Sequence, residues 1–512
     1  MKEVVVIGGG PAGIFAALYA ASNHVHVTLL EKNNEPLKKL LLTGSGKCNF
    51  WNQDQDLKHF HSESSFLAEI FNKENFDEVY KTILGMGIIP ICKENYMYPY
   101  SMQSFTVKHA FLEEVRLKNI DFELNCEVLL VSKNDSDFEI MTNKGKYKAD
   151  AVVLCSGSRA YPKTGSDGKG YELASNLGHS IVPVLPSLVG LEMSENFLND
   201  WAGVRSHVKV SLVENGHVLI SDEGEIQLTR TGISGICVFH LSRQVARGLF
   251  KHQDEMVEIN FLPFVSDVKT FLDEQNQIVK NRDIGTLLEA ILNYKIVDVI
   301  LKRCNIKRNS FYAFLSKEEK DKLIAMLSAF PCKIIGTKGF DSSQVCSGGV
   351  CLDEIDLSRM ESKIVKGLFF AGEVLDIDGD CGGYNLEIAF ISGMIAGKGV
   401  LNSFTHSMKL VDFAFQKIVN QEKDIEVRLN DEKRKTIKVG NFIEFENIST
   451  HEKVLVKVVR LHPFDSFDQL FSSFDYKRLG INKEEDFTIM NQFYSLEEQK
   501  KYGALGIEIK LL

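Results

Sequence analysis

The segment Glu3-Val-Val-Val-Ile-Gly-Gly-Gly-Pro-Ala-Gly13 decides the fold of this 512-residue chain. Its apolar run predicts a buried parallel strand, and the glycine-rich turn that follows opens a predicted helix over residues 11–22. Residues 25–30 predict the next strand, which ends at Glu31. A strand–helix–strand unit of this kind is typical of a doubly wound α/β domain that binds a dinucleotide at its first turn.

Each glycine of the Gly8-x-Gly10-x-x-Gly13 pattern has its own task. Gly8 permits the tight turn, Gly10 lets the backbone approach a pyrophosphate, and Gly13 lets the helix sit close to the sheet. The helix N-terminus offers N–H donors to the phosphates, and an acid after the second strand accepts from ribose hydroxyls. The residues expected to bind the dinucleotide here are Gly8, Gly10, Pro11, Ala12, Gly13, Glu31 and Lys32.

The composition excludes several classes of protein. Hydrophobic residues make up 44% and charged residues 25% of the chain, which excludes disorder, collagen and coiled coil. The length predicts three or more packed units, since single cores stop growing at roughly 250–300 residues. A net charge of −10 argues against nucleic-acid binding through bulk charge, although it leaves a local basic face open.

Cysteine and histidine usage adds further expectations. Ten cysteines without CxxC spacing predict a reduced, cytoplasmic protein. The uncharged segment Val4–Asn23 resembles a membrane span, but its central glycines and proline interrupt it, so we expect no membrane segment. The histidines form no HxxxH pattern and no cluster with cysteines, so we expect no metal site.

Apolar periodicity predicts the remaining organisation of the chain. Helices are expected over 64–89, 104–117 and 384–401, a mainly antiparallel β region over 204–262, and a helical region over 266–328. After Ser403 the pattern changes, and residues 405–512 are expected to form a separate domain in which a helix precedes the strands.

The number of glycine patterns favours FAD over NAD as the bound dinucleotide. An enzyme with separate FAD and NAD domains should show two such patterns in strand–helix context, and this chain shows one. Later segments also fit FAD, since one strand ends in Ser156-Gly157 and another in Gly372-Glu373. Cys381-Gly-Gly-Tyr-Asn385 opens a helix whose N-terminus could stabilise the charge of a reduced flavin.

Over about residues 1–403 the chain resembles the BaiN-like (YhiN-type) flavoprotein family. The motifs that carry the resemblance are Lys39–Asn49, Thr229–Gly235, Ser347–Val350 and, most specifically, Ala371-Gly-Glu-Val-Leu-Asp-Ile-Asp-Gly-Asp-Cys-Gly-Gly-Tyr-Asn385. The resemblance implies a Rossmann-like FAD domain of the glutathione-reductase type over 1–190 and 345–403. It also implies a β-barrel-like insert over 191–265 and 329–344, and a helical cap over 266–328.

The same resemblance places residues 43–49 and 381–385 beside the isoalloxazine. We interpret the first of these segments as a loop that gives backbone N–H groups to the flavin, with a plain surface turn as the alternative. Lys47 in this loop would favour an anionic substrate or a reduced flavin. The further residues expected to bind FAD are Lys39, Thr43, Gly44, Gly46, Lys47, Cys48, Asn49, Val128, Ser156, Gly157, Gly372, Glu373, Gly382, Gly383, Tyr384 and Asn385.

Two thiols are candidates for the chemistry, Cys48 and Cys381, and Tyr384 and Asn385 complete the predicted catalytic set. Either thiol could protonate a substrate carbon after hydride transfer. Alternatively, the two could form a redox disulfide, or both could be small packing residues. The spacing along the chain leaves all three interpretations open.

Residues 407–512 resemble an ASCH domain, a PUA-like small β-barrel associated with RNA. The resemblance rests on Lys423-Asp-Ile-Glu-Val-Arg-Leu-Asn-Asp-Glu-Lys-Arg434, Ile437–Phe445 and Tyr502–Lys510. Some ASCH proteins hydrolyse an acetylated cytidine with a lysine and a threonine three residues later, whereas Glu426 stands at that distance from Lys423 here. The basic residues Lys423, Arg428, Lys433 and Arg434 predict a phosphate path for RNA, with a solvated charged face as the alternative.

Together these features predict a FAD-dependent oxidoreductase that reduces an activated C=C bond, with NADH or NADPH as the diffusible reductant. The lead substrate is uridine in ribosomal RNA, because an RNA-handling module lacks a reason on a small-molecule reductase. The alternatives are reduction of a small enone of steroid type, oxidation of an amine, and a non-enzymatic RNA-binding protein that holds FAD structurally.

Overall fold

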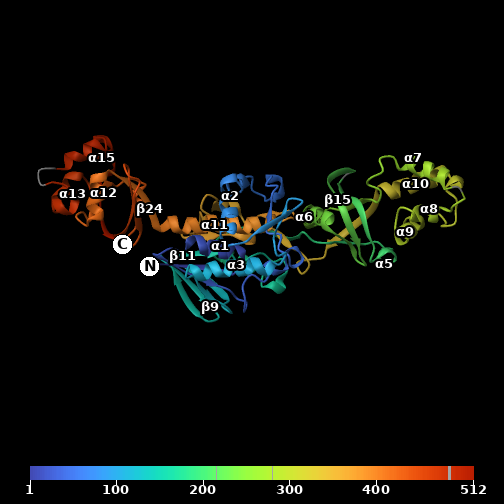
Figure 1. Cartoon of the computed structure of the whole chain (residues 1–512), viewed down its shortest axis with the longest axis horizontal. Coiled ribbons are helices and arrows are strands. Elements are labelled where there is room, and N and C mark those ends of the chain that lie inside the picture. Colours follow the sequence, from blue (N-terminus) through green and yellow to red (C-terminus); the bar gives the residue numbers. More distant parts are fainter. Residues whose placement is uncertain (136, 215, 280, 483–485) are drawn as a thin grey trace. The chain divides into compact units, whose positions relative to one another are not determined.

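The computed structural model describes residues 1–135, 137–214, 216–279, 281–482 and 486–512. Residues 136, 215, 280 and 483–485 fall inside segments predicted above and lie outside the described residues. The chain forms two compact units, Met1–Gly399 and Val400–Leu512, whose elements are labelled in Figure 1.

A seven-stranded sheet with the order β20-β21-β22-β11-β1-β2-β7 forms the base of the first unit. Strand β1 pairs in parallel with both β2 and β11, which confirms the predicted strand–helix–strand unit and the α/β class. The apolar run of β1 is buried because this strand is central in the sheet. The strands are β1 (Lys2–Ile7), β2 (Val25–Leu30), β7 (Asp121–Glu123), β11 (Ala151–Leu154), β20 (Ile355–Asp356), β21 (Glu361–Ser362) and β22 (Leu368–Phe370).

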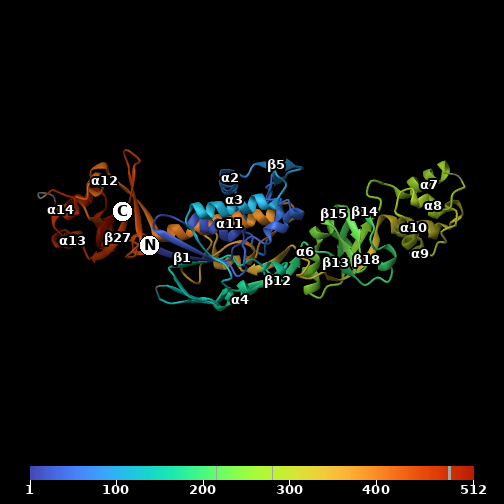
Figure 2. The same ribbon diagram turned by 60° about the horizontal axis from the view of Figure 1, so that its bottom comes forward.

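Three helices pack together through phenylalanine side chains. They are α1 (Pro11–Ala20), α3 (Ser104–Leu117) and α11 (Tyr384–Phe404). The ring of Phe15 in α1 lies 5.5 Å from Phe111 of α3 and 4.7 Å from Phe390 of α11. Figures 1 and 2 show α3 and α11 side by side, so a helix from the end of the unit packs beside helices from its beginning.

Glycines bring the backbones of α1 and α11 into contact. A Cβ on Gly393 would lie 2.5 Å from the carbonyl oxygen of Ala12, and one on Gly397 would lie 2.5 Å from that of Ala16. Small residues on both helices are therefore required by the close approach, and the helix N-termini are held in one rigid arrangement.

Smaller elements complete the dinucleotide-binding part of the unit. The predicted helix over 64–89 is confined to α2 (Lys73–Gly85), whereas 104–117 is confirmed as α3. The other elements are β3 (Trp51–Asn52), β4 (Phe60–His61), β5 (Pro90–Lys93), β6 (Tyr96–Pro99), β8 (Val128–Lys133), β9 (Phe138–Thr142), β10 (Gly145–Ala149), α4 (Lys169–Asn176), β12 (Ile181–Ser187), β19 (Val345–Val350) and β23 (Asp378–Gly379).

The insert is a closed barrel with the strand order β13-β16-β15-β14-β17-β18. Helices α7 to α10 follow β17 in the chain and precede β18, and they share one hydrophobic core with the barrel (Figure 2). The strands are β13 (Leu191–Met193), β14 (Arg205–Glu214), β15 (His217–Leu228), β16 (Gly232–Ser234), β17 (Glu255–Asn260) and β18 (Phe330–Thr337). The helices are α5 (Leu198–Trp201), α7 (Val268–Ile278), α8 (Ile284–Glu289), α9 (Tyr294–Cys304) and α10 (Lys317–Ser328).

The region over 204–262 is mainly antiparallel β structure, as predicted, but it also contains a helix that was not predicted. The expected β region over 204–262 contains the 15-residue helix α6 (Ile236–Phe250). Its buried residues Val238, Leu241 and Val245 recur every three or four positions, which is the spacing of a helix packed on one face. Apolar and polar residues alternate in the flanking strands, and this pattern concealed the change from a strand period to a helix period in the sequence.

The second unit pairs five strands in the order β24-β26-β27-β28-β25, which confirms a small β-rich domain. It begins with a strand, so the expected order of a helix before the strands is wrong. The elements are β24 (Thr405–Leu410), α12 (Asp412–Val419), β25 (Ile425–Leu429), β26 (Phe442–Asn447), β27 (Lys453–Phe464), α13 (Phe467–Ser473), α14 (Tyr476–Leu479), α15 (Leu496–Tyr502) and β28 (Ala504–Leu511).

The close contact of α1 and α11 can be tested with Gly393→Ala. In an open helix this change should stabilise by roughly 1 kcal/mol, because alanine has the higher helix propensity. Here the added Cβ meets the Ala12 carbonyl, so we expect the unfolding free energy to fall by about 1–3 kcal/mol. Denaturant unfolding measures the change in unfolding free energy in either direction. The control is Gly85→Ala in α2, where the added Cβ would meet no described atom within 4 Å. A stabilised Gly393→Ala protein would contradict the contact.

Candidate active site

A cleft of about 1350 Å³ runs through the first unit, past the ends of β1 and β2 to the wall of the barrel. This volume exceeds the roughly 300–1,000 Å³ of ordinary ligand pockets, which suits an extended dinucleotide with room for a substrate. We call residues 8–12 with Glu31 its dinucleotide end. Its reaction end is lined by Tyr96, Tyr98, Asp222, His240 and Cys381.

The dinucleotide end has the backbone geometry that a pyrophosphate needs. Gly8 has φ +111°, and a Cβ there would lie 2.4 Å from the Cys155 carbonyl oxygen. A Cβ on Gly13 would lie 1.9 Å from the Gly8 carbonyl oxygen, so the helix packs as closely as predicted. A Cβ on Gly10, in contrast, would meet no described protein atom within 4 Å. It would project into the cleft, where the backbone has been left bare for a ligand.

Glu31 holds the position predicted for a ribose acceptor. Its Oε2 accepts from the backbone N–H of Gly9 at 2.8 Å, and its Oε1 accepts from the Asn33 side chain at 2.7 Å. These donors orient the carboxylate at the end of β2, where it lines the cleft.

Three of the lysines that line the cleft, Lys32, Lys39 and Lys169, form ion pairs with neighbouring acids. Lys39 donates to Glu373 at 2.6 Å, and the Ser158 hydroxyl donates to the same Glu373 oxygen at 2.8 Å. Lys32 pairs with Asp167 at 2.8 Å. Lys39 and Glu373, two predicted FAD-binding residues from distant segments, therefore form an ion pair in the cleft, and their charges largely cancel.

The loop after β2 places only some of its predicted residues in the cleft. Thr43, Gly44 and Asn49 line the cleft, whereas Gly46 and Lys47 are exposed and are not lining residues. The Oδ1 atom of Asn49 is buried and has no hydrogen-bond partner in the part of the chain that the structure describes. Such an orphaned acceptor fits a group that awaits the N–H of a ligand.

Cys48 is fully buried and is not a lining residue, although it lies in the same loop. Burial raises the pKa of its thiol to about 12, and a contact with Thr43 offsets only part of this effect. A thiol in this state is a weak proton donor that solvent reaches poorly, so its position favours the packing interpretation. Cys381 is partly exposed and lines the cleft.

Glycines shape the loop that carries Cys381. Gly382 and Gly383 have φ of +134° and +106°, and Cβ atoms there would lie 2.7 Å from the Tyr96 ring and 2.9 Å from the Trp51 backbone. The side chain of Asn52 donates to the Gly382 carbonyl oxygen at 2.9 Å. This packing aims the start of α11 at the cleft.

The other two predicted catalytic residues support this loop. Asn385 donates to the Gly379 carbonyl oxygen at 2.8 Å and accepts from the Gly379 N–H at 2.9 Å. Tyr384 is buried, is not a lining residue, and stacks on His59 with the ring centroids 4.5 Å apart. Burial raises the pKa of its phenol. Their visible contacts are those of positioning residues.

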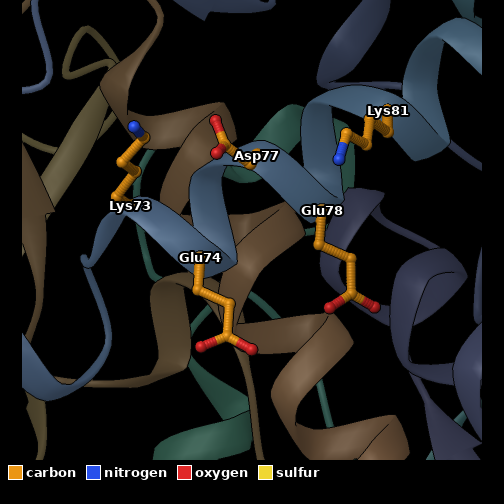
Figure 3. A pocket seen from close by; sticks show the side chains of 5 residues that line it. All are labelled: Lys73, Glu74, Asp77, Glu78 and Lys81. Atoms are coloured by element: carbon orange, nitrogen blue, oxygen red, sulfur yellow. The ribbon is translucent and has the colours of Figure 1, made fainter.

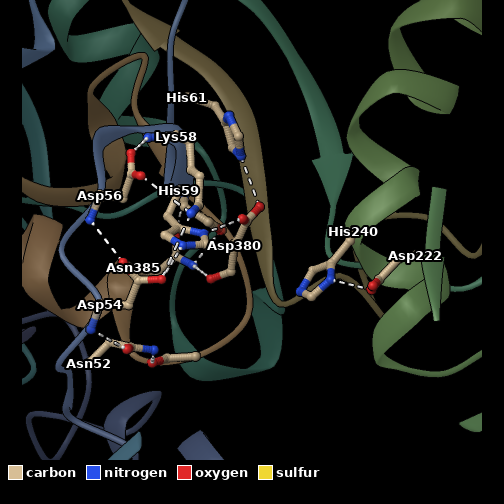
Figure 4. A network of polar contacts seen from close by, with 12 residues as sticks. Asn52, Asp54, Asp56, Lys58, His59, His61, Asp222, His240, Asp380 and Asn385 are labelled. Carbon is tan, nitrogen blue, oxygen red and sulfur yellow. Dashed lines mark hydrogen bonds and ion pairs between the residues drawn. The ribbon is translucent and has the colours of Figure 1, made fainter. Parts of the chain in front are cut away.

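A network of polar contacts holds the loop that carries Cys381 in place (Figure 4). Asp380 accepts from His59 and His61, each at 2.9 Å, and the histidine contacts lower its pKa although burial opposes them. Asp378 accepts from Arg243 of α6 at 3.0 Å, which joins the loop to the insert.

The insert supplies two site residues that the sequence analysis missed. Asp222 of β15 and His240 of α6 line the reaction end, and their Oδ2 and Nδ1 atoms are 2.7 Å apart (Figure 4). No local motif contains them, since one lies on a strand and the other on the helix that was mistaken for β structure. Only the packing of α6 against β15 brings them together.

Most of the residues predicted to bind the cofactor line the cleft. The lining residues are Gly8, Gly10, Pro11, Ala12, Glu31, Lys32, Lys39, Thr43, Gly44, Asn49, Val128, Ser156, Gly157, Gly372, Glu373, Gly382, Gly383 and Asn385. Gly13, Gly46, Lys47, Cys48 and Tyr384 lie outside the lining. The hydroxyl of Ser156 is, like the Asn49 oxygen, buried without a partner among the described residues. The bare glycine backbone, the acid after β2 and these orphaned groups fit FAD.

A second hollow lies on α2 and carries no comparable features. It is lined by Lys73, Glu74, Asp77, Glu78 and Lys81, whose side chains project from successive turns of the helix (Figure 3). It shares no residue with the cleft.

The basic residues predicted to bind RNA are mostly paired with acids. The buried carboxylate of Glu426 lies 3.0 Å from Lys423 and 2.9 Å from Arg428, and these two cations lower its pKa against the effect of burial. Arg434 pairs with Asp431. Three of the four predicted RNA-binding residues therefore have acidic partners, and Lys433 keeps its charge uncompensated by any described ion pair.

Comparison with known proteins identifies the family. Residues 2–399 match the family described as HI0933-like protein Rossmann domain, and residues 408–512 match the ASCH domain. The chain therefore belongs to the HI0933-like family of FAD-binding Rossmann-type oxidoreductases and carries a C-terminal ASCH domain. Both predicted resemblances are confirmed.

Relatives with assigned activities cover the first unit. A 3-dehydro-bile acid delta(4,6)-reductase of Clostridium scindens is 33% identical over 403 residues, which are 78% of this chain and 98% of that protein. A ribosomal RNA dihydrouridine synthase of Escherichia coli is 28% identical over 422 residues, again 78% of this chain and 98% of the relative. A solved 3-ketosteroid-delta4-(5alpha)-dehydrogenase of Rhodococcus jostii RHA1 is 15% identical and covers 78% of this chain and 97% of its own, with a TM-score of 0.40.

Two further features are absent from the described residues. They contain no helix that is long and apolar enough to cross a membrane. They also contain no group of three or more His, Cys, Asp or Glu residues arranged to hold a metal ion.

Gly10→Val tests the placement of the cofactor. The valine side chain would enter the cleft without meeting other protein atoms, so we expect a folded protein that retains little FAD. Flavin absorbance per protein after gel filtration measures the loss. Gly85→Val, where a Cβ is equally free of contacts, is the matched control and should stay fully loaded. A yellow Gly10→Val protein would show that the pyrophosphate lies elsewhere.

Proposed function

We propose that the protein is a FAD-dependent reductase of an activated C=C bond, with NADH or NADPH as the electron donor. The observation that carries the proposal is one continuous cleft with a dinucleotide end and, at the other end, a partly exposed thiol beside a histidine–carboxylate pair. When bound, FAD would supply the hydride from the nicotinamide to the substrate carbon. The chain itself binds the dinucleotide through residues 8–12 and Glu31 and offers proton donors where the substrate would lie.

The charge of the reaction end favours a small conjugated ketone as the substrate. Asp222, Glu223 and Glu225 of β15 line this wall, and the nearby Arg205 is paired with Glu225 at 2.8 Å. Phosphate groups brought to an acidic wall are repelled, whereas an uncharged enone is not. The relative that acts on a bile acid, at 33% identity, supports the same substrate class.

Uridine in ribosomal RNA is the second candidate, and the ASCH domain favours it. A relative at 28% identity is a ribosomal RNA dihydrouridine synthase, and the C=C bond of uracil is likewise conjugated to a carbonyl. A nucleoside must be turned out of its RNA to enter such a cleft, so a separate RNA-binding unit has a use. The acidic wall would then face the flanking phosphates, which is the cost of this assignment.

Anaerobic half-reactions separate these functions. We expect NADPH or NADH to bleach the flavin, and a steroid 4-en-3-one to restore its colour, because the enone accepts both electrons. The saturated ketone of the same skeleton is the matched control and should leave the flavin bleached. No bleaching by either nicotinamide would support a structural flavin, and hydrogen peroxide formed from amines in air would support an oxidase.

The RNA candidate has its own test in the cell. Mass spectrometry of ribosomal RNA from a deletion strain should show every uridine position unchanged if the substrate is a small enone. The loss of two hydrogens from one nucleotide, restored by the wild-type gene, would assign RNA as the substrate.

The second unit can be tested for RNA binding with Lys433→Ala combined with Lys438→Ala. These lysines have no described ion pair, so their removal should weaken RNA binding and reduce the salt slope by about 1.4, at about 0.7 per single-strand phosphate contact. Fluorescence anisotropy over a salt series measures both. Lys417→Ala combined with Lys453→Ala removes the same charge from lysines paired with Glu422 and Glu444, and should change the slope less. Equal slopes in all three proteins would exclude this phosphate path.

A further inference from the structure

We propose that Cys381, His240 and Asp222 form one proton-donating site, with Cys381 as the catalytic thiol and the other two as positioning residues. The inference rests on the proposed function, since it names the groups that complete the reduction of a conjugated C=C bond. It extends that function to two residues of the insert.

Two domains of the first unit contribute to this site. Asp222 belongs to β15 and His240 to α6, and the 2.7 Å contact between Oδ2 and Nδ1 fixes the orientation of the imidazole ring. The opposite ring atom, Nε2, is buried and has no hydrogen-bond partner among the described residues. The Cys381 thiol lies close enough to the imidazole of His240 to raise its pKa. A buried donor that is held by a carboxylate and left unsatisfied toward the cleft is the arrangement that activates thiols in other enzymes.

The imidazole of His240 is charged at neutral pH. Burial lowers its pKa, but the contacts with Asp222 and Cys381 outweigh burial and raise the pKa to about 10. The other ionisable groups that face this cluster are Asp380, Cys237 and Tyr96. Asp380 accepts from His59 and His61 and adds a favourable charge for His240 at longer range, so it reinforces the imidazolium.

Cys381 is distinguished from the other thiols of the cleft by its exposure. Cys126, Cys155 and Cys237 also line the cleft, but their side chains are 1%, 4% and 1% exposed. Burial raises the pKa of Cys155 and of Cys237, so these thiols stay protonated and inert. Cys381 is the partly exposed thiol that an imidazolium also touches.

The proton balance of the step is simple. Reduction of a conjugated ketone adds a hydride to the β carbon, its two electrons coming from the nicotinamide, and a proton to the α carbon. The S–H bond of Cys381 breaks as the new C–H bond forms, which leaves a thiolate. Nε2 of His240 then returns a proton to the sulfur, and solvent restores the imidazolium. The net reaction consumes one nicotinamide hydride and one solvent proton.

Alkylation of Cys381 tests the site without substrate turnover. The holoenzyme is treated with iodoacetamide between pH 6 and 10, and the modified peptide is quantified by mass spectrometry. Because a cation beside the sulfur favours its attack on the reagent, we expect Cys381 to react faster at pH 7 in the wild type than in His240→Asn. The two rates should converge near pH 10, where His240 loses its charge.

Matched variants separate a positioning role from a structural one. Asp222→Asn should slow alkylation in the same direction, since it removes the carboxylate that holds the charged ring. His207→Asn removes a histidine that pairs with Glu223 at 3.0 Å on the neighbouring strand, and should leave the profile of Cys381 unchanged. FAD content reports whether each variant is folded, and Asp222→Asn serves if His240→Asn does not load.

The outcomes distinguish this inference from the proposed function. Identical alkylation profiles in wild type, His240→Asn and Asp222→Asn would overturn the site, whatever the enzyme reduces. In stopped-flow experiments with the enone, Cys381→Ser should slow reoxidation of the flavin by roughly 10²–10⁴-fold, the range of a general acid, and leave its reduction by nicotinamide unchanged. Unchanged reoxidation would also overturn it. A wild type that reduces no enone or uridine, with the alkylation pattern intact, would refute the function and keep the thiol–imidazole–carboxylate site.

Discussion

The close contact between α1 and α11 is the constraint on which the cleft depends. Gly393 and Gly397 let the backbone of α11 contact the carbonyl groups of Ala12 and Ala16 in α1. This contact leaves no room for a methyl group between the two helices. Both helices begin at the cleft, one behind the glycine turn of β1 and the other behind Cys381. Two helix N-termini, each with a positive dipole, are thereby held at one cleft, where they would favour an anionic cofactor.

The loop before α11 lines the cleft and contacts the insert. Asp378 is held by Arg243 of α6, and Asp380 is held by His59 and His61. These contacts come from two other parts of the chain, so the position of Cys381 depends on α6 of the insert and on the small β4–β23 pair. The position of Cys381 is consequently sensitive to how the insert packs, and the same insert places Asp222 and His240 in the cleft.

The regions of the molecule differ in charge, and this difference decides which of them can attract a polyanion. Three lysines of the cleft are paired with neighbouring acids, and the barrel wall is acidic, so the site as a whole offers little attraction to a polyanion. In the ASCH domain, Lys423 and Arg428 surround the buried Glu426, where removal of one cation would leave a buried charge unpaired. Only part of the basic run therefore remains for phosphate contacts.

The sequence by itself determined the α/β class, the dinucleotide turn at Gly8 to Gly13 and the acid at Glu31, because these features depend on neighbours within about thirty residues. It also singled out Cys381, which lines the cleft. It could not separate Cys381 from Cys48, since exposure is decided by distant packing, nor find α6 between alternating strands. Asp222 and His240 were decided by tertiary structure alone: they meet because a helix of the insert packs on a strand of the barrel, and no spacing along the chain records that contact.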